Sequence, residues 1–374
     1  MTETEMSKSK RGLARDFLAF VIALSAVGCD GSSVPSEPVL RESLACEPLS
    51  PVDPGSVLPV PAPQRSRGEE AIAWDLRNNR LVALNHPGFA SPMIVAVDLE
   101  TRVVAAALEQ GSSRGVAGLQ VAAATSAILY TDGLFYADGF SLIRLGTGTI
   151  ASPQNVEFLL SPDGRWVVFY DETWVIQDLS SGARRGLAAI SGGPIAIDAA
   201  GDQVAFGFLN DPFADSIRVV TASTGAVRAM SRSGGALRSA GFIGDRLHVI
   251  ISREQYIANG CYRATFLERQ EGTEGEVTIG AVAARDLGPS GDLCVAWSWD
   301  THTGVAVAEE LPSAYKTPPR YQISLMGGGN MQAIGSADIW FPTDCTLSPD
   351  GRWFVYGNAM GYVDTGELYL KRVP

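Results

Sequence analysis

The first pattern with catalytic residue types is Gly111-Ser-Ser-Arg-Gly115, which matches the Gly-x-Ser-x-Gly arrangement of a nucleophilic serine, here Ser113. In hydrolases that serine lies on a sharp turn between a strand and a helix. The flanking runs 103–108 and 116–124 both have strand character. The pattern therefore indicates a linker between two strands rather than a nucleophile.

The three histidines, His86, His248 and His302, are isolated in the sequence, without a second ligand at metal-binding spacing. General-base catalysis and metal binding both need partner side chains within reach. His248 alternates with apolar residues, which is typical of a structural residue in a strand. We therefore predict no catalytic residue, no metal site and no cofactor, and favour a binding protein over an enzyme.

Aromatic residues next to turn signals could line a binding face. The residues with this character are Trp174, Phe213, Trp297 and Trp299. Large aromatic side chains more often fill the packing between strands, and we favour that interpretation here.

Composition limits the partners that the chain can have. Its 374 residues carry a formal net charge of −12, with the acidic residues scattered singly. A nucleic-acid binder needs a basic face to neutralise phosphates, so we expect no nucleic-acid partner. The 40 glycines and 21 prolines supply the many turns that an all-β fold requires.

One turn-and-strand unit occurs twice with little change. Leu-Ser-Pro-Asp-Gly-Arg-Trp at 160–166 recurs at 347–353, and each copy continues into an apolar run. Ser-Pro-Asp-Gly favours a tight turn because proline presets φ and glycine accepts a positive φ. Each copy therefore predicts a hairpin between two strands.

Weaker copies of this unit extend the pattern along the chain. The turn positions are Asn79, Ser126, Gly164, Gly201, Gly244, Gly291 and Gly351, at intervals of 37–60 residues. A second turn signal follows a later strand at 95–101, 175–182 and 219–225, where a third strand would join a fourth. We expect the longer stretches 255–278, 312–321 and 327–330 to be insertions, and Glu367–Lys371 to be a final strand that pairs with the other chain end.

These units resemble the WD40-like repeats of TolB-type bacterial β-propellers. The resemblance covers about 300 residues and is specific in the two Leu-Ser-Pro-Asp-Gly-Arg-Trp copies. It implies an all-β propeller of four-stranded blades. Seven turn positions favour seven blades, with six and eight as alternatives. The motif encodes a turn, so it implies no particular chemistry.

The N-terminus has the three parts of an export signal. Basic residues precede an apolar run at 17–27, which is too short to span a bilayer, and Cys29 follows at once. The stretch Ser25–Cys29 resembles a bacterial lipobox, although Ala26 stands where that family usually has leucine. The resemblance implies cleavage after Gly28 and acylation of Cys29, with palmitate among the usual acyl chains.

We therefore divide the chain into a cleaved signal peptide (1–28), a lipidated, proline-rich tether (29–67) and a β-propeller (68–374). The expected product is a lipoprotein of the cell envelope, anchored to the inner or outer membrane, with a periplasmic body. We expect the propeller to bind a protein or peptide. The alternative is an exported lyase or hydrolase with a site at the propeller channel.

Four cysteines remain after the anchor, and an even number in an exported chain favours disulfides. Cys261 and Cys294 belong to neighbouring repeats, whereas Cys46 and Cys345 lie at opposite ends of the chain. These positions predict the pairs Cys261–Cys294 and Cys46–Cys345. Buried free thiols are the alternative.

Overall fold

The computed structural model describes a chain that is built from β-strands. The described residues are 52–61, 72–85, 93–109, 119–122, 127–130, 135–138, 141–144, 158–188, 190–209, 216–231, 234–258, 261–285, 293–311, 318–340, 342–360 and 363–374. Within these ranges the only helical segment is one 3₁₀ turn, η1 (Leu76–Asn78). None of the described segments is a helix long and apolar enough to cross a membrane.

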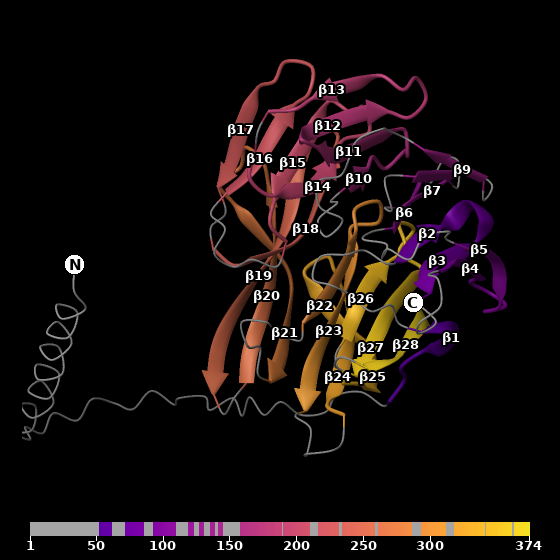
Figure 1. Ribbon diagram of the computed structural model, residues 1–374. Coiled ribbons are helices and arrows are strands. Elements are labelled where there is room, and N and C mark those ends of the chain that lie inside the picture. Colours follow the sequence, from indigo (N-terminus) through magenta and orange to yellow (C-terminus); the bar gives the residue numbers. More distant parts are fainter. Residues whose placement is uncertain are drawn as a thin grey trace, which may run out of the picture. The chain divides into compact units, whose positions relative to one another are not determined.

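The described strands form seven four-stranded antiparallel sheets (Figure 1). Six of these sheets take four consecutive strands each, in chain order. The first three contain β2 (Ile72–Asp75), β3 (Arg80–Asn85), β4 (Met93–Asp98), β5 (Val104–Glu109); β6 (Leu119–Ala122), β7 (Ala127–Tyr130), β8 (Phe135–Asp138), β9 (Ser141–Arg144); and β10 (Phe158–Leu160), β11 (Trp166–Asp171), β12 (Thr173–Asp178), β13 (Arg184–Gly186).

The next three sheets follow the same plan, and the β18–β21 sheet has the longest strands. They contain β14 (Gly193–Ile197), β15 (Gln203–Gly207), β16 (Ser216–Thr221), β17 (Val227–Ser231); β18 (Ala236–Ile243), β19 (Arg246–Ala258), β20 (Cys261–Gln270), β21 (Glu276–Arg285); and β22 (Cys294–Ser298), β23 (Thr303–Leu311), β24 (Arg320–Gly327), β25 (Asn330–Asp338).

The seventh sheet joins the two ends of the described chain. It contains β26 (Pro342–Leu347), β27 (Trp353–Met360), β28 (Val363–Arg372) and, as the outermost strand, β1 (Ser56–Pro61). The expected pairing of the final strand with the other chain end is thus confirmed. β1 lies inside the segment 29–67 that we predicted to be only a tether. An edge strand tolerates the prolines of β1 because its outer side needs no backbone donor.

The first strands of the sheets make a closed circuit. Each of β2, β6, β10, β14, β18 and β22 contacts the next first strand, and β26 contacts β2. Trp74 Nε1 on β2 donates to Thr346 Oγ1 on β26 at 2.9 Å, across the junction between the chain ends. This circuit confirms the fold class predicted from the repeats, an all-β propeller of four-stranded blades.

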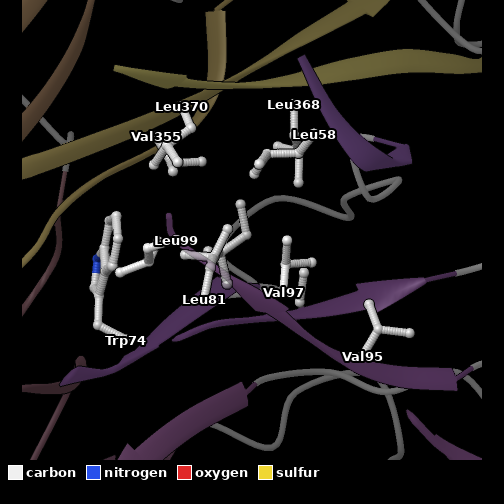
Figure 2. Packing of buried hydrophobic residues seen from close by; sticks show 11 residues of the cluster. Leu58, Trp74, Leu81, Val95, Val97, Leu99, Val355, Leu368 and Leu370 are labelled. Carbon is white, nitrogen blue, oxygen red and sulfur yellow. The ribbon is translucent and has the colours of Figure 1, made fainter. Parts of the chain in front are cut away.

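Packing between sheets fills the core at the same junction. Figure 2 shows Leu58 of β1 with Leu368 and Leu370 of β28, facing Leu81, Val95 and Val97 of the β2–β5 sheet. Each buried leucine contributes about 1.5–3 kcal/mol relative to an exposed one. The two ends of the chain are therefore held by apolar burial as well as by strand pairing.

The repeated turn has the same hydrogen bonds in both copies. Ser161 Oγ accepts from the Trp166 amide at 2.9 Å, and Ser348 Oγ accepts from the Trp353 amide at 2.9 Å. The glycine amide donates to the serine carbonyl at 2.8 Å in each turn. The third-to-fourth strand turns at 95–101, 175–182 and 219–225 also lie where they were predicted.

The tryptophan of the motif packs on the turn of the next sheet. Gly201 has a φ of +67°, and a Cβ at this position would lie 2.2 Å from the Trp166 ring. Only glycine satisfies both conditions, because a side chain would be strained and would also clash. The motif therefore encodes the contact between sheets as well as a hairpin.

Three expectations about the repeat are wrong. The segment after Gly291 is β22, a first strand, and the turn of that sheet is at 299–302, where His302 has a φ of 53°. The stretch 255–278 is not an inserted loop but continues the β19–β20 hairpin. Residues 327–330 form a tight turn between β24 and β25, in which two glycines adopt positive φ.

Candidate interaction site

Exposed apolar side chains lie at the ends of the second strands in three consecutive sheets. They are Tyr170 on β11, Phe208 and Leu209 just after β15, and Tyr256 on β19, each between 47% and 58% exposed. All second strands run in the same direction around the ring, so their ends share one face. We call these four residues the apolar rim. Apolar groups gathered on one face are typical of a binding surface.

Tyr170 is held in place by aromatic neighbours. Its ring meets the buried Trp174 ring edge-on at 5.3 Å, across the tight β11–β12 turn. Trp174 in turn lies 5.3 Å from Phe206, which is fully buried in the next sheet. The exposed ring therefore rests on a packed aromatic row and loses little side-chain entropy on binding.

Tyr256 lies in the part of the β19–β20 hairpin that extends past β18. It faces Tyr262 directly across the strand pair, with ring centroids 5.3 Å apart. Two ion pairs lie beside it: Arg253 to Glu276 at 2.8 Å and Arg238 to Glu254 at 3.2 Å. Burial lowers the pKa of the Arg238 guanidinium. This part of the rim combines an exposed aromatic pair with charged side chains, among them the exposed Arg263 opposite Gln255.

Two of the histidines are not isolated, contrary to the prediction. His248 Nδ1 lies 2.8 Å from Glu268 Oε1, and His302 Nδ1 lies 3.8 Å from Glu268 Oε2. The separation in sequence hid this contact because the β22–β23 turn, which carries His302, packs against the β18–β21 sheet. Spacing along the sequence shows which residues are neighbours within a strand, but not which residues meet across strands or between sheets.

Two tryptophans surround these histidines. Trp299 lies 6.2 Å from the His302 ring and donates through Nε1 to Ser239 Oγ at 3.1 Å. Trp297 packs partly buried on the apolar core between the two sheets. No arrangement of three or more metal-ligating side chains occurs in the described ranges. The cluster joins two sheets, and its geometry does not point to a nucleophile.

The disulfide in the structure differs from both predicted pairs. Cys294 on β22 bonds to Cys345 on β26, with their Cα atoms 5.9 Å apart. The pairing Cys261–Cys294 followed neighbouring repeats, but Cys261 begins the third strand of its sheet, whereas β22 and β26 are first strands in contact. The pairing Cys46–Cys345 is also wrong, because Cys345 is bonded to Cys294.

The remaining sequence candidates have separate outcomes. Trp174 is buried in the core, as the packing interpretation predicted. The positions outside the described residues are Cys29, Cys46, His86, Ser113 and Phe213, and the side chain of Cys261 also lies outside them. Sequence patterns did not reveal the apolar rim. Tyr170 continues an apolar run that otherwise fills the core, whereas Tyr256 follows the polar stretch 252–255. The exposure of both depends on where pairing with the first strand ends, which the sequence does not show.

Comparisons with known proteins support the fold. Neither a family model nor a curated protein matches the chain. The β-propeller domain of Myceliophteria thermophila Cps50 (Swd1) is similar over 83% of this chain and 98% of its own, at 14% identity and a TM-score of 0.51. A chain of the mitotic checkpoint complex is similar over 93% and 98%, at 15% identity and a TM-score of 0.53.

A protein from Agrobacterium tumefaciens that is assigned as TolB is similar over 74% of this chain and 96% of its own. The identity is 14% and the TM-score 0.44. At identities of 14% and 15%, the similarities to the Cps50 (Swd1) domain and to the mitotic checkpoint chain show the fold and not the activity. The chain folds as a β-propeller.

Proposed function

We propose that this protein is a cell-envelope lipoprotein, anchored through acylated Cys29, whose propeller binds a protein or peptide partner. The observation that carries the binding role is the apolar rim, which exposes four large apolar side chains on one face. We further propose that each four-stranded sheet is one blade, which gives a ring of seven.

Several features support the binding role. The propeller face offers rigid loop ends, and protein interfaces are rich in tyrosine and phenylalanine. The similar Cps50 (Swd1) domain and the mitotic checkpoint chain share the fold, and the latter was crystallised as part of a complex. The net charge of −12 disfavours nucleic acid as the partner.

Photo-crosslinking in the native envelope tests the binding role. A crosslinking amino acid at Tyr170 or Phe208 should capture a defined partner. The matched control is Val277, which is 66% exposed at the start of β21, at the opposite end of the strands. Equal capture from Val277 and from the rim would contradict the proposal, as would capture from neither.

Fractionation tests the anchor separately. We expect the wild-type chain to incorporate an alkyne-labelled fatty acid and to sediment with membranes. Cys29→Ser should lose both the label and the sedimentation, because several acyl chains at one residue are needed for stable anchoring. A Cys29→Ser protein that stayed in the membrane fraction would refute the lipid anchor.

A further inference from the structure

The β10–β13 sheet holds one of its own arginines between an aromatic ring and a carboxylate. The Arg184 guanidinium lies over the Phe169 ring, 5.4 Å from its centroid, and Arg184 Nη1 lies 3.4 Å from Asp171 Oδ2. Arg184 Nε also donates to Gln177 Oε1 at 2.8 Å. Phe169 and Asp171 are two residues apart on β11, so they lie on the same face of the strand. A ring and a carboxylate at this spacing thus provide two of the contacts that hold the guanidinium.

A second arginine is held in the same way at the opposite end of β11. Arg165 lies over the Trp166 ring at 5.0 Å, and its Nη2 donates to Asp178 Oδ2 at 2.7 Å. Arginine suits such places because its planar guanidinium stacks on an aromatic ring and forms hydrogen bonds to a carboxylate at its edge. This sheet therefore uses the combination of ring and carboxylate twice to bind its own arginines.

Tyr170 and Glu172 repeat the combination one residue further along β11. Tyr170 is 48% exposed, and its ring is held edge-on by the buried Trp174. Glu172 is exposed at the tip of the β11–β12 turn and forms no ion pair with any described residue. The connections 145–157, before β10, and 210–215, between β15 and β16, contain no lysine or arginine, so neither supplies a cation. The pair is thus available to an arginine of another molecule.

Glu172 occupies a backbone conformation that favours glycine. Its φ is 58°, in the left-handed region that residues with a side chain rarely adopt. Strained positions of this kind gather at binding sites. Arg102 has the same conformation, with a φ of 60°, in the turn between β4 and β5 on the opposite face. The conformation alone therefore does not distinguish Glu172, but its place beside Tyr170 does.

We infer that Tyr170 and Glu172 bind an arginine side chain of the protein partner. The inference rests on the proposed function, because it specifies the group of the partner that contacts the apolar rim. The guanidinium would stack on the exposed Tyr170 ring and pair with the Glu172 carboxylate, as the guanidinium of Arg184 does within the sheet. The net charge of −12 favours the approach of such a cationic group.

A small arginine probe tests the contact without the partner. The probe is N-acetyl-arginine methylamide, and the signal is the fluorine NMR shift of a fluorotyrosine incorporated at position 170 of the full chain. We expect a saturable shift with this probe and none with the citrulline analogue, which has a similar shape but no charge. Glu172→Gln should weaken binding of the probe roughly fivefold. No saturable shift, equal binding of the citrulline analogue, or an unchanged affinity in Glu172→Gln would overturn the inference.

Glycine variants separate binding from the structure of the turn. Glu172→Gly and Arg102→Gly each place glycine at a positive φ, so both proteins should melt at the wild-type temperature or above it. Only Glu172→Gly should bind the arginine probe more weakly, again roughly fivefold. Equal affinities of the two glycine variants would show that the Glu172 carboxylate takes no part in binding, and the inference would be wrong.

The outcomes separate this inference from the proposed function. A photo-crosslinker at Phe208, elsewhere on the apolar rim, reports on the partner itself. If it captured the partner equally well in the wild type and in Glu172→Gln, the binding role would stand and the arginine contact would be refuted. If the probe bound at Tyr170 but Phe208 captured no partner, the arginine site would be supported and the protein-binding role would fail.

Discussion

The short and the long sheets of this propeller are stabilised in different ways. In the β10–β13 and β14–β17 sheets the strands have three to six residues. In the β18–β21 sheet they have 8 to 13 residues. A three-residue strand forms few ladder hydrogen bonds, so the turns must fix its register. The longer strands form more ladder hydrogen bonds, and β19 continues past the end of its pairing with β18.

The turns of the short sheets show this dependence on side-chain hydrogen bonds. Asp178 Oδ1 accepts from the Ser180 amide at 2.8 Å, and Asp198 Oδ1 accepts from the Gln203 amide at 3.0 Å. Apolar cores join neighbouring sheets in both regions, and the β18–β25 part of the ring has in addition a disulfide between β22 and β26. The two regions therefore differ in strand length and in this covalent long-range contact.

The disulfide predicts the largest difference between the two regions. The double substitution Cys294→Ser and Cys345→Ser opens a loop with a sequence separation of 51 residues. The chain-entropy account gives a loss of about 4 kcal/mol in the free energy of unfolding. Urea denaturation measures the loss, and hydrogen exchange should show faster opening of β22 and β26 than of β10 and β14. Equal acceleration in all four strands would contradict the comparison.

The second largest loss of stability should come from the contacts between β27–β28 and the N-terminal segment at Asp53 and Pro54. Lys371 is buried on β28 and donates to Asp53 Oδ2 at 2.6 Å, and Tyr356 Oη donates to the Pro54 carbonyl at 2.6 Å. We expect Lys371→Met to lower the free energy of unfolding by about 1–3 kcal/mol, because charged hydrogen bonds to the N-terminal segment are lost. Arg372→Met, an exposed neighbour, should stay within about 0.5 kcal/mol of wild type in the same urea titration.

The sequence predicted most of the fold, because each repeat consists of a turn and a strand that are determined by residues adjacent in the sequence. Ser161 and Gly164 define a turn by their own bonding and conformational freedom, so both copies of the motif could be placed correctly. The weak copy at Gly291 led to a wrong assignment of β22 as a second strand. A turn glycine before an apolar run can precede any strand of a sheet. The turn of that sheet uses His302 in a left-handed conformation, which few patterns would predict.

The disulfide and the candidate site depend on contacts between sheets, which local patterns do not contain. Cys294 and Cys345 meet because their strands are adjacent first strands. Glu268 and His302 meet because a turn of one sheet packs on another. Tyr256 is exposed only because β19 continues beyond β18, and that depends on a register that the sequence alone leaves open.

Removal of one motif hydroxyl should have a moderate effect that depends on the sheet. Ser161→Ala and Ser348→Ala each take away the acceptor of a tryptophan amide, which should cost about 1 kcal/mol. In the short β10–β13 sheet we also expect faster exchange at Val167 and Val168, since only three residues of β10 pair with β11. The same acceleration around Ser348 would show that strand length does not matter here.

The smallest effect should come from the ion pair between the β10–β11 turn and the last residue of β12. Arg165 Nη2 donates to Asp178 Oδ2 at 2.7 Å, and this hydrogen bond holds the pKa of the Asp178 carboxyl well below its usual range. The unfolded chain therefore binds more protons than the folded chain in acid. The contribution is complete above the ordinary carboxyl pKa of about 4 and is lost as the pH falls through the lowered value.

Arg165→Gln should accordingly reduce the acid dependence of stability, with urea midpoints that fall less steeply than those of wild type between about pH 4 and pH 2. The change should be small because the Arg165 side chain is half exposed and solvent screens the pair. Added salt should shrink the difference further. Parallel curves for the two proteins would mean that the serine and backbone bonds to Asp178 fix its pKa without Arg165, and that the short sheet relies on neutral turn bonds alone.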